Sequence, residues 1–371
     1  DPNWFAESPP RLMEVFWASV RRNIPLSSAT ERAIREHLYL VNDAFRTSDV
    51  VLRFFLAICR RPLQAGGALR QMASCGLLGE YLPEFAAVGG IVRFEDFHSY
   101  PVDEHTLRAV EAIQHLYETD GSVARMLQKT LEHLRDPHVL ILSLLCHDLG
   151  KAEGEEHVES GVRIVRAMSQ RMGLAEEDAE RVEFLVRHHM LMTHTSMYRD
   201  IDDPELVVQF AENMRSVERL RDLLLLSYAD LSAVGPGVWT EWKGALLWKL
   251  YLRAERHLLG RGSGSGEEYW TQPKAEAVAG LLPEASTTTR TTPSTIRSCR
   301  WRSWPRAPSG FAWARRRSAH HSPRLRCSRS PWPRSTCSPV VAPASGSGSA
   351  GCRRSMRPLA CRANVAVNAW R

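Results

Sequence analysis

Residues 139–151 are VLILSLLCHDLGK, an apolar run that ends in a histidine-aspartate pair followed by Gly150 and Lys151. A run of this length and apolarity predicts a buried helix. Placing His147 and Asp148 at its end costs free energy because both groups lose water, unless a partner compensates them. A metal ion is one such partner, since imidazole and carboxylate are ligands of Mn, Fe, Zn and Mg sites. A hydrogen-bonded helix terminus is the other interpretation.

Further histidines and one aspartate lie on predicted helical faces that are otherwise apolar or small. His105 is followed at helical spacing by alanines, and Asp230 follows leucines at the same offsets. His157 and His189 belong to two other predicted helices and share their faces with glycine, valine and leucine. Buried aspartate is rare unless it is paired or bound to a metal. Together with the His-Asp pair, these residues predict one buried metal centre.

The hydrophobic periodicity predicts an all-α fold over residues 1–260, because it follows the helical period and shows no convincing alternation of period two. In the first part, Ser28 with Glu31 suggests a capping box, and Ser48 is placed to cap an apolar segment. Pro62 and the pair Gly66-Gly67 are expected to interrupt the helices. From Asp103 onward the predicted helices span residues 103–118, 121–134, 137–149, 157–172, 176–192, 204–213, 216–233 and 238–259.

The sequence divides into three predicted parts. Residues 1–95 form a helical domain, and residues 96–260 form a helical bundle that contains the candidate metal ligands. Residues 261–371 begin with a Gly/Ser linker and continue as a tail rich in Arg, Ser and Pro. We expect this tail to be disordered, because its apolar residues are too few and too unpatterned to offset the entropy of ordering.

Charge is distributed unevenly between these parts. The whole chain has a formal charge of +6, but residues 1–284 hold 31 basic and 42 acidic side chains, a net charge of −11. Residues 285–371 hold 17 arginines and no acidic residue. We expect this tail to be an out-of-frame translation of a GC-rich gene, and the alternative is an Arg/Ser-rich arm that binds nucleic acid. The basic charge of the whole chain therefore does not indicate a nucleic-acid partner.

Other features concern the compartment in which the protein acts. No run of about 18 apolar residues is present, and Asp1 begins no signal-peptide pattern, so neither a membrane span nor a secretory leader is expected. Cys59, Cys75 and Cys146 have unrelated spacing, which indicates a reducing environment. These observations predict a cytoplasmic protein, and the lack of an initiator methionine suggests a fragment.

The order of His105, the pair His147-Asp148 and then Asp230 resembles the HD superfamily of metal-dependent phosphohydrolases. Roughly residues 5–260 are similar to one family in it, the bifunctional uridylyltransferase/uridylyl-removing enzymes of the PII signal-transduction protein. The motifs behind this similarity are CGLLGEYLPEF at 75–85, HSYPVDEHTL at 98–107, HDLGK at 147–151, HMLM at 189–192 and YADLSA at 228–233.

The resemblance implies an HD-domain helical bundle preceded by a helical domain that links to a nucleotidyltransferase domain. It implies a metal held by His105, His147, Asp148 and Asp230, and a second metal held with His157 and His189. Mn²⁺ or Mg²⁺ is the expected ion, with Fe and Zn as alternatives. Asp148 and Lys151 are the expected catalytic residues, and the alternative for Lys151 is an interaction with the helix dipole. His98 and Arg108 are weaker candidates for phosphate contact.

The implied reaction is hydrolysis of the phosphodiester between UMP and a tyrosine of uridylylated PII. The transferase and ACT domains of the family are not expected in this chain. Uridylyl transfer is therefore not expected, and glutamine is expected to regulate only the full-length enzymes. Neither nucleic acid nor membrane is an expected partner. Two alternatives are an HD phosphohydrolase that acts on free nucleotides and a catalytically idle helical regulatory fragment.

Overall fold

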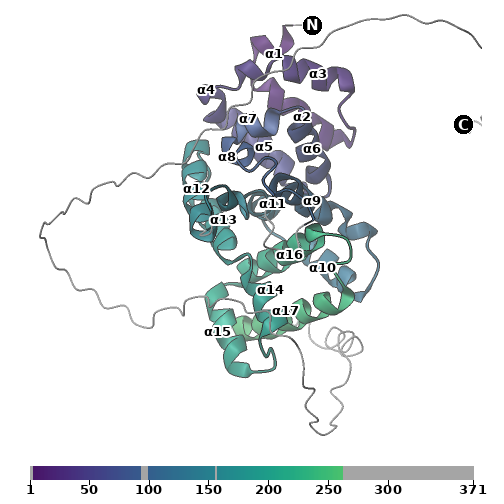
Figure 1. Cartoon of the computed structure of the whole chain (residues 1–371), viewed down its shortest axis with the longest axis vertical. Helices are drawn as coiled ribbons and strands as arrows, with labels where there is room; N and C mark the ends of the chain where they lie inside the picture. Colours follow the sequence, from purple (N-terminus) through teal and green to yellow (C-terminus); the bar gives the residue numbers. More distant parts are fainter. Residues whose placement is uncertain (1–2, 93–98, 155–156, 262–371) are drawn as a thin grey trace, which may run out of the picture. The chain divides into compact units, whose positions relative to one another are not determined.

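The computed structural model describes residues 3–92, 99–154 and 157–261, which belong to a single compact unit. Within these ranges every regular element is an α-helix or a short 3-10 helix, so the predicted all-α fold is confirmed there (Figure 1). The predicted disordered tail lies outside the described residues from position 262 onward. The predicted domain boundary between residues 95 and 96 also falls outside them.

The first part of the chain is a group of helices that packs around aromatic and aliphatic side chains. The buried rings of Phe16, Phe55 and Tyr81 lie in this core. Helix α5 packs against both α2 and α11, so the first group is continuous with the helices that follow. The elements are α1 (Trp4–Glu7), α2 (Arg11–Arg22), α3 (Ser28–Glu36), η1 (Leu38–Leu40), α4 (Asp43–Arg46), α5 (Asp49–Cys59), α6 (Pro62–Ser74), α7 (Leu77–Tyr81) and α8 (Pro83–Ala86).

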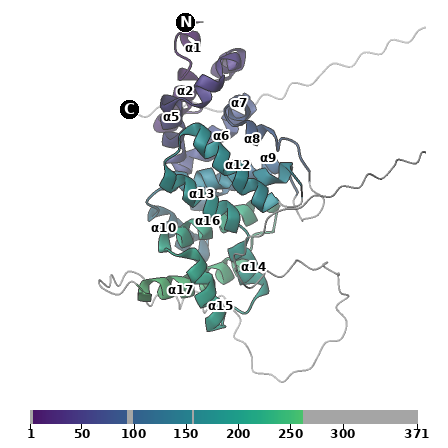
Figure 2. The ribbon, with the colours of Figure 1, turned by 90° about the vertical axis from the view of Figure 1, so that its left-hand side faces the viewer.

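The second group of helices surrounds α11, which is visible in Figure 1 among its neighbours. Helices α5, α9, α13 and α16 all pack against it. The elements are α9 (Val102–Gln114), η2 (His115–Glu118), α10 (Ser122–Glu132), α11 (Pro137–Cys146), η3 (Leu149–Ala152), α12 (His157–Met172), α13 (Glu176–His188), α14 (Leu191–Tyr198), α15 (Pro204–Met214), α16 (Val217–Val234) and α17 (Glu241–Arg261). Figure 2 shows α12 and α13 side by side, in agreement with their contacts.

Helix α11 is central because its sequence is apolar on every face. Pro137 occupies its first turn, where a missing N–H costs nothing, and residues 138–146 are all buried. A helix that is hydrophobic all round must be covered on all sides. The end of α11 therefore lies inside the bundle, and the polar pair that follows it is buried as well.

Two local predictions were wrong. The pair Gly66-Gly67 does not interrupt a helix but lies inside α6. A Cβ atom at Gly66 would lie 3.0 Å from the Cα of Glu111, so this glycine permits close packing of α6 on α9. The cap of α3 is Ser27 rather than Ser28, because the Ser27 side chain accepts a hydrogen bond from the N–H of Thr30.

The predicted helix over residues 176–192 is two helices. Helix α13 ends at His188 and α14 begins at Leu191, with His189 at the helix end between them. Similarly, the helix predicted to reach residue 149 ends at Cys146. In both places the apolar pattern continues past the helix end, because Leu149 after α11 and Met192 after α13 are buried in the same core.

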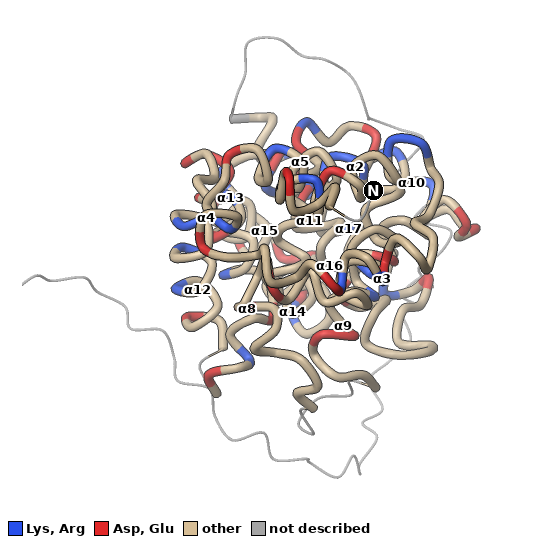
Figure 3. The backbone as a smooth tube through the Cα atoms, turned by 90° about the horizontal axis from the view of Figure 1, so that it is seen from above, with Lys and Arg blue, Asp and Glu red and all other residues tan. Residues whose placement is uncertain are grey.

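Several features of the described residues bear on possible partners. Basic and acidic side chains are interspersed over the helices (Figure 3). None of the helices in the described part of the chain combines the length and hydropathy that a bilayer-spanning segment needs.

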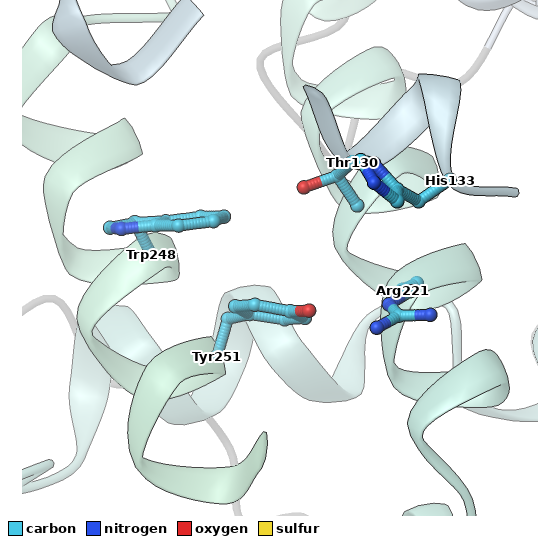
Figure 4. Close-up of a pocket in the computed structure, with 5 residues that line it drawn as sticks. All are labelled: Thr130, His133, Arg221, Trp248 and Tyr251. Carbon is cyan, nitrogen blue, oxygen red and sulfur yellow. The ribbon is translucent and has the colours of Figure 1, made fainter. Parts of the chain in front are cut away.

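A small cavity between α10, α16 and α17, lined by side chains that include Arg221, Trp248 and Tyr251, measures about 10 Å³ (Figure 4). This volume is close to that of a single water molecule, so it is too small for a substrate.

Candidate metal centre

Two of the predicted site histidines are oriented by the same type of hydrogen bond, from a ring nitrogen to a backbone carbonyl of the preceding helix. His147 follows the end of α11 and His189 follows the end of α13. Nδ1 of His147 donates to the carbonyl oxygen of Leu144 at 2.8 Å, and Nδ1 of His189 donates to that of Val186 at 2.8 Å. A carbonyl can only accept, so Nδ1 bears the proton and Nε2 is the ring nitrogen left to bind another group.

His105, His147 and Asp230 converge from three different elements. Nε2 of His105, on α9, lies 3.0 Å from Oδ1 of Asp230, on α16, and 3.2 Å from Nε2 of His147. The distance from Nε2 of His147 to Oδ1 of Asp230 is 3.8 Å. Potential ligand atoms of the three residues all lie within 4.8 Å of one another. This spacing is compact enough for one cation to contact all three.

Asp148, His157 and His189 form a second group with the same property, since their ligand atoms also lie within 4.8 Å of one another. Asp148 joins the two groups, because its Oδ2 lies 3.4 Å from Nε2 of His147. The same Oδ2 accepts a hydrogen bond from Nζ of Lys151 at 2.7 Å. The structure thus brings all six predicted ligands together and places Lys151 beside them, on the carboxylate that links the two groups.

The electrostatics of the centre favour bound positive charge. Burial alone would lower the pKa of His147, but the carboxylates of Asp148 and Asp230 outweigh it and raise that pKa to about 9. Burial alone would raise the pKa of either carboxylic acid, but hydrogen bonds and charges from the histidines hold both well below the usual value. For His189, burial and the charge of His147 lower the pKa to about 4. Two ionised carboxylates in a buried site attract a cation.

Glycines allow α12 to approach the end of α11. A Cβ atom at Gly150, in η3, would overlap the carbonyl oxygen of His157 and lie 2.5 Å from the backbone nitrogen of Gly161. Only a residue without a side chain fits between these backbones. The close approach places the first residue of α12, His157, next to the loop that contains Asp148.

A buried ion network joins three of the helices that position the centre. Arg181 on α13 donates to Asp136, the residue preceding α11, at 2.7 Å and to Asp222 on α16 at 2.8 Å. Asp222 is fully buried, and its burial raises its pKa to about 6 although the charge of Arg181 opposes the shift. Helices α11, α13 and α16 are those that end at, or contain, His147, His189 and Asp230.

We expect Arg181→Met to lower the free energy of unfolding by about 3–5 kcal/mol, because it leaves the Asp222 carboxylate buried without its partner. Urea unfolding followed by circular dichroism measures this change. Arg166→Gln is the matched control, since Arg166 pairs with Glu183 between α12 and α13 at the surface, where removal of an ion pair has little effect. Equal stability of the two variants would contradict the assigned role of Arg181.

Sequence analysis missed this network, although a signal was present. Asp222 directly precedes the run Leu223 to Leu226, where an aspartate on a buried face requires a partner. Its partner could not be chosen from the sequence because Arg181 lies on another helix. His188, beside His189, is half-buried and contacts Phe184, with ring centroids 4.6 Å apart.

Comparison with known families identifies the class. Residues 102–228 match the HD domain, and residues 1–81 match the third domain of the uridylyltransferase GlnD. The helical fold and the buried His/Asp centre therefore belong to an HD domain, with the donor set of a hydrolase-type, divalent-metal site. Asp230 lies two residues beyond the matched HD segment.

A curated relative defines the family more closely. Over 286 residues the chain is 35% identical to the bifunctional uridylyltransferase/uridylyl-removing enzyme of Methylococcus capsulatus (strain ATCC 33009 / NCIMB 11132 / Bath). The match covers 75% of this chain and 32% of the relative. The chain is thus related to the bifunctional uridylyltransferase/uridylyl-removing enzymes through its GlnD third domain and its HD domain, and it spans about a third of the length of this relative.

Proposed function

We propose that this chain is a divalent-metal-dependent phosphodiesterase that removes UMP from a uridylylated tyrosine of the PII protein. The observation that supports this proposal most strongly is the convergence of six His and Asp side chains into two groups joined by Asp148. We take the uridylyl-removing reaction from the name of the relative, and the assignment to hydrolases from the match to the HD domain.

The donor set fits a pair of divalent cations. We assign the first to His105, His147, Asp148 and Asp230, and the second to Asp148, His157 and His189. The mixture of imidazole and carboxylate suits Mn²⁺ or Mg²⁺, and also Fe or Zn. When bound, such ions polarise a phosphoryl oxygen and lower the pKa of a water molecule that they hold.

The remaining groups of the centre have roles that follow from their positions. The Lys151 ammonium lies within the centre on the Asp148 carboxylate, where it is placed to donate to a non-bridging oxygen of the phosphodiester as negative charge develops. The leaving group is a tyrosinate, whose conjugate acid has a pKa of about 10. Its departure therefore needs less help from a general acid than departure of an alkoxide does.

Metal removal is the first test of this function. We expect the chain with Mn²⁺ to release UMP from uridylylated PII, and we expect EDTA to abolish the release, as followed by anion-exchange chromatography of the products. Readdition of Mn²⁺ restores activity if the protein has stayed folded. Full activity in EDTA would contradict a metal-dependent mechanism.

Activity on free nucleotides, and metal binding, distinguish this proposal from the two alternative functions. Hydrolysis of free deoxynucleoside triphosphates or guanosine tetraphosphate, without release of UMP from PII, would favour a general nucleotide phosphohydrolase. A folded chain that binds no divalent metal would favour the catalytically idle fragment. Each outcome leaves the fold assignment intact and replaces the proposed reaction.

A further inference from the structure

A cleft of about 380 Å³ lies where α9 meets the segment that connects α16 to α17. Its lining includes Tyr100, just before α9, and Arg108, within α9. It also includes Ala233, Gly235 and Trp239 from the end of α16 and the loop after it. Small-molecule sites commonly have volumes of about 300–1,000 Å³, so the cleft is large enough for a nucleoside. Its remaining lining is mixed, with exposed polar groups and the Pro236-Gly237 turn.

The cleft adjoins the candidate metal centre. Arg108 lies one helical turn beyond His105 on α9, and Ala233 lies one turn beyond Asp230 on α16. Side chains one turn apart on a helix are neighbours at about 5–6 Å. Because His105 and Asp230 contact each other at 3.0 Å, both cleft residues lie within one helical turn of the same pair of candidate ligands.

Asp230 is more exposed than two of the other candidate ligands. The Asp230 side chain is 18% exposed, whereas those of His105 and Asp148 are 1% and 3% exposed. A phosphodiester that enters the centre past Asp230 would have Ala233 and the cleft within one helical turn of its ester groups.

Two glycines fix the walls of the cleft. A Cβ atom at Gly235 would lie 2.5 Å from Oγ of Ser99, and the N–H of Ser99 donates to the carbonyl oxygen of Val234 at 2.9 Å. The residue after Ser99, Tyr100, is thereby held against the end of α16. On the other wall, a Cβ atom at Gly244 would lie 2.8 Å from the Trp239 ring, so the indole packs directly on the α17 backbone. The walls are preorganised.

The chemistry of these walls suits a nucleobase. The Arg108 guanidinium lies 3.9 Å from the centroid of the Tyr100 ring, and its Nε donates to Glu104 at 2.6 Å, which fixes its plane. The Trp239 ring packs edge-on against Tyr228, with centroids 4.8 Å apart. Aromatic faces and a stacked arginine are the groups that bind unpaired bases, whatever the base sequence.

We propose that this cleft binds the nucleoside of the nucleotidyl group, with its base against Trp239 and Tyr100 and its phosphorus at the metal centre. The inference rests on the proposed phosphodiesterase function, and it names the part of the substrate that the chain recognises outside the reacting bond. Arg108 then contacts the base carbonyls or the ribose, and acts as a specificity residue rather than as a phosphate ligand.

The test compares two substrates with the same leaving group. The p-nitrophenyl ester of UMP contains a nucleoside, whereas methyl p-nitrophenyl phosphate has a methyl group in its place. We expect Trp239→Ala and Tyr100→Ala each to raise KM for the UMP ester about tenfold or more, and to leave kcat/KM for methyl p-nitrophenyl phosphate within about twofold of the parent. Calorimetric binding of UMP gives a readout independent of turnover, and we expect it to weaken by the same factor.

Two further variants distinguish loss of nucleoside binding from damage to the fold. Trp239→Phe keeps an aromatic face, so it is expected to recover most of the lost UMP affinity. Trp242→Ala is the matched control, because Trp242 is three residues away, 51% exposed and outside the cleft lining. Its UMP affinity should equal that of the parent.

The inference and the proposed function fail in different ways. If Trp239→Ala impairs both nitrophenyl substrates equally, or leaves UMP binding unchanged, the nucleoside site is wrong although the hydrolase stands. If it weakens hydrolysis of uridylylated PII alone, the cleft binds the protein loop and the nucleoside site is again overturned. Absence of UMP release from PII contradicts the proposed function, while UMP binding that Trp239→Ala abolishes still supports the site.

Discussion

Asp148→Asn is expected to reduce release of UMP from uridylylated PII by roughly a thousandfold or more. The substitution removes the negative charge that lies between the two groups of candidate ligands, because Oδ2 of Asp148 is 3.4 Å from Nε2 of His147, and the same oxygen is the partner of Lys151. Metal ions supply several kcal/mol of transition-state stabilisation, which corresponds to a loss of this size. His147→Ala should have a similar effect, because its Nε2 lies against both His105 and Asp148.

Measuring the metal content together with the circular dichroism of these two variants distinguishes loss of a metal ligand from unfolding of the protein. Both variants should bind less Mn²⁺ per chain by equilibrium dialysis, while their circular dichroism remains that of a helical protein. His188→Ala is the matched control, since His188 neighbours His189 but contacts Phe184 instead of the centre. Parental activity and metal content in Asp148→Asn would show that the site is assigned to the wrong residues.

Gly150→Ala is expected to have the second large effect, a loss of activity together with a loss of stability of about 3 kcal/mol or more. The added methyl group would overlap the carbonyl oxygen of His157 and approach the backbone of Gly161. Backbone atoms cannot move aside as a flexible side chain does, so α12 must shift and His157 must move away from Asp148. Steric strain in a packed core commonly costs a few kcal/mol.

A second glycine offers a matched control. Gly67 lies within α6, and a Cβ atom there would be 3.8 Å from Gln114, an ordinary contact. Alanine is favoured over glycine in a helix by about 0.5–1 kcal/mol, so Gly67→Ala should be neutral or slightly stabilising. Thermal unfolding and the Mn²⁺ content of the two variants check this pair. A Gly150→Ala variant as stable and as active as Gly67→Ala would exclude the close approach of η3 and α12.

The fold was predictable because its determinant is local. The run from Val139 to Leu145 has no polar face, so it must be a central element, and the structure places it in α11 with neighbours on all sides. Helix ends were less predictable, as at His189, where the apolar pattern continues through the break. Gly66 was misjudged because glycine is favoured both by turns and by close helix packing, and only the neighbouring helix α9 decides between them.

The members of the candidate centre were predictable as a set, because histidine and aspartate on apolar faces are costly without partners. Their grouping did not follow from the helical pattern, since the three-residue sets depend on how α9, α12 and α16 cross; it was implied by the family resemblance. The ion network of Arg181 and the cleft beside Trp239 depend on contacts between residues far apart in the sequence. Neither follows from a pattern along one helix.

Anomalous diffraction from crystals of the chain grown with Mn²⁺ tests the metal centre most directly. We predict one anomalous peak bonded to Nε2 of His105 and His147 and to Asp230, and a second bonded to His157 and His189, with Asp148 contacting both. An ordered centre with no anomalous density, in which Lys151 still pairs with Asp148, would contradict the assignment of these residues to a metal-dependent hydrolase.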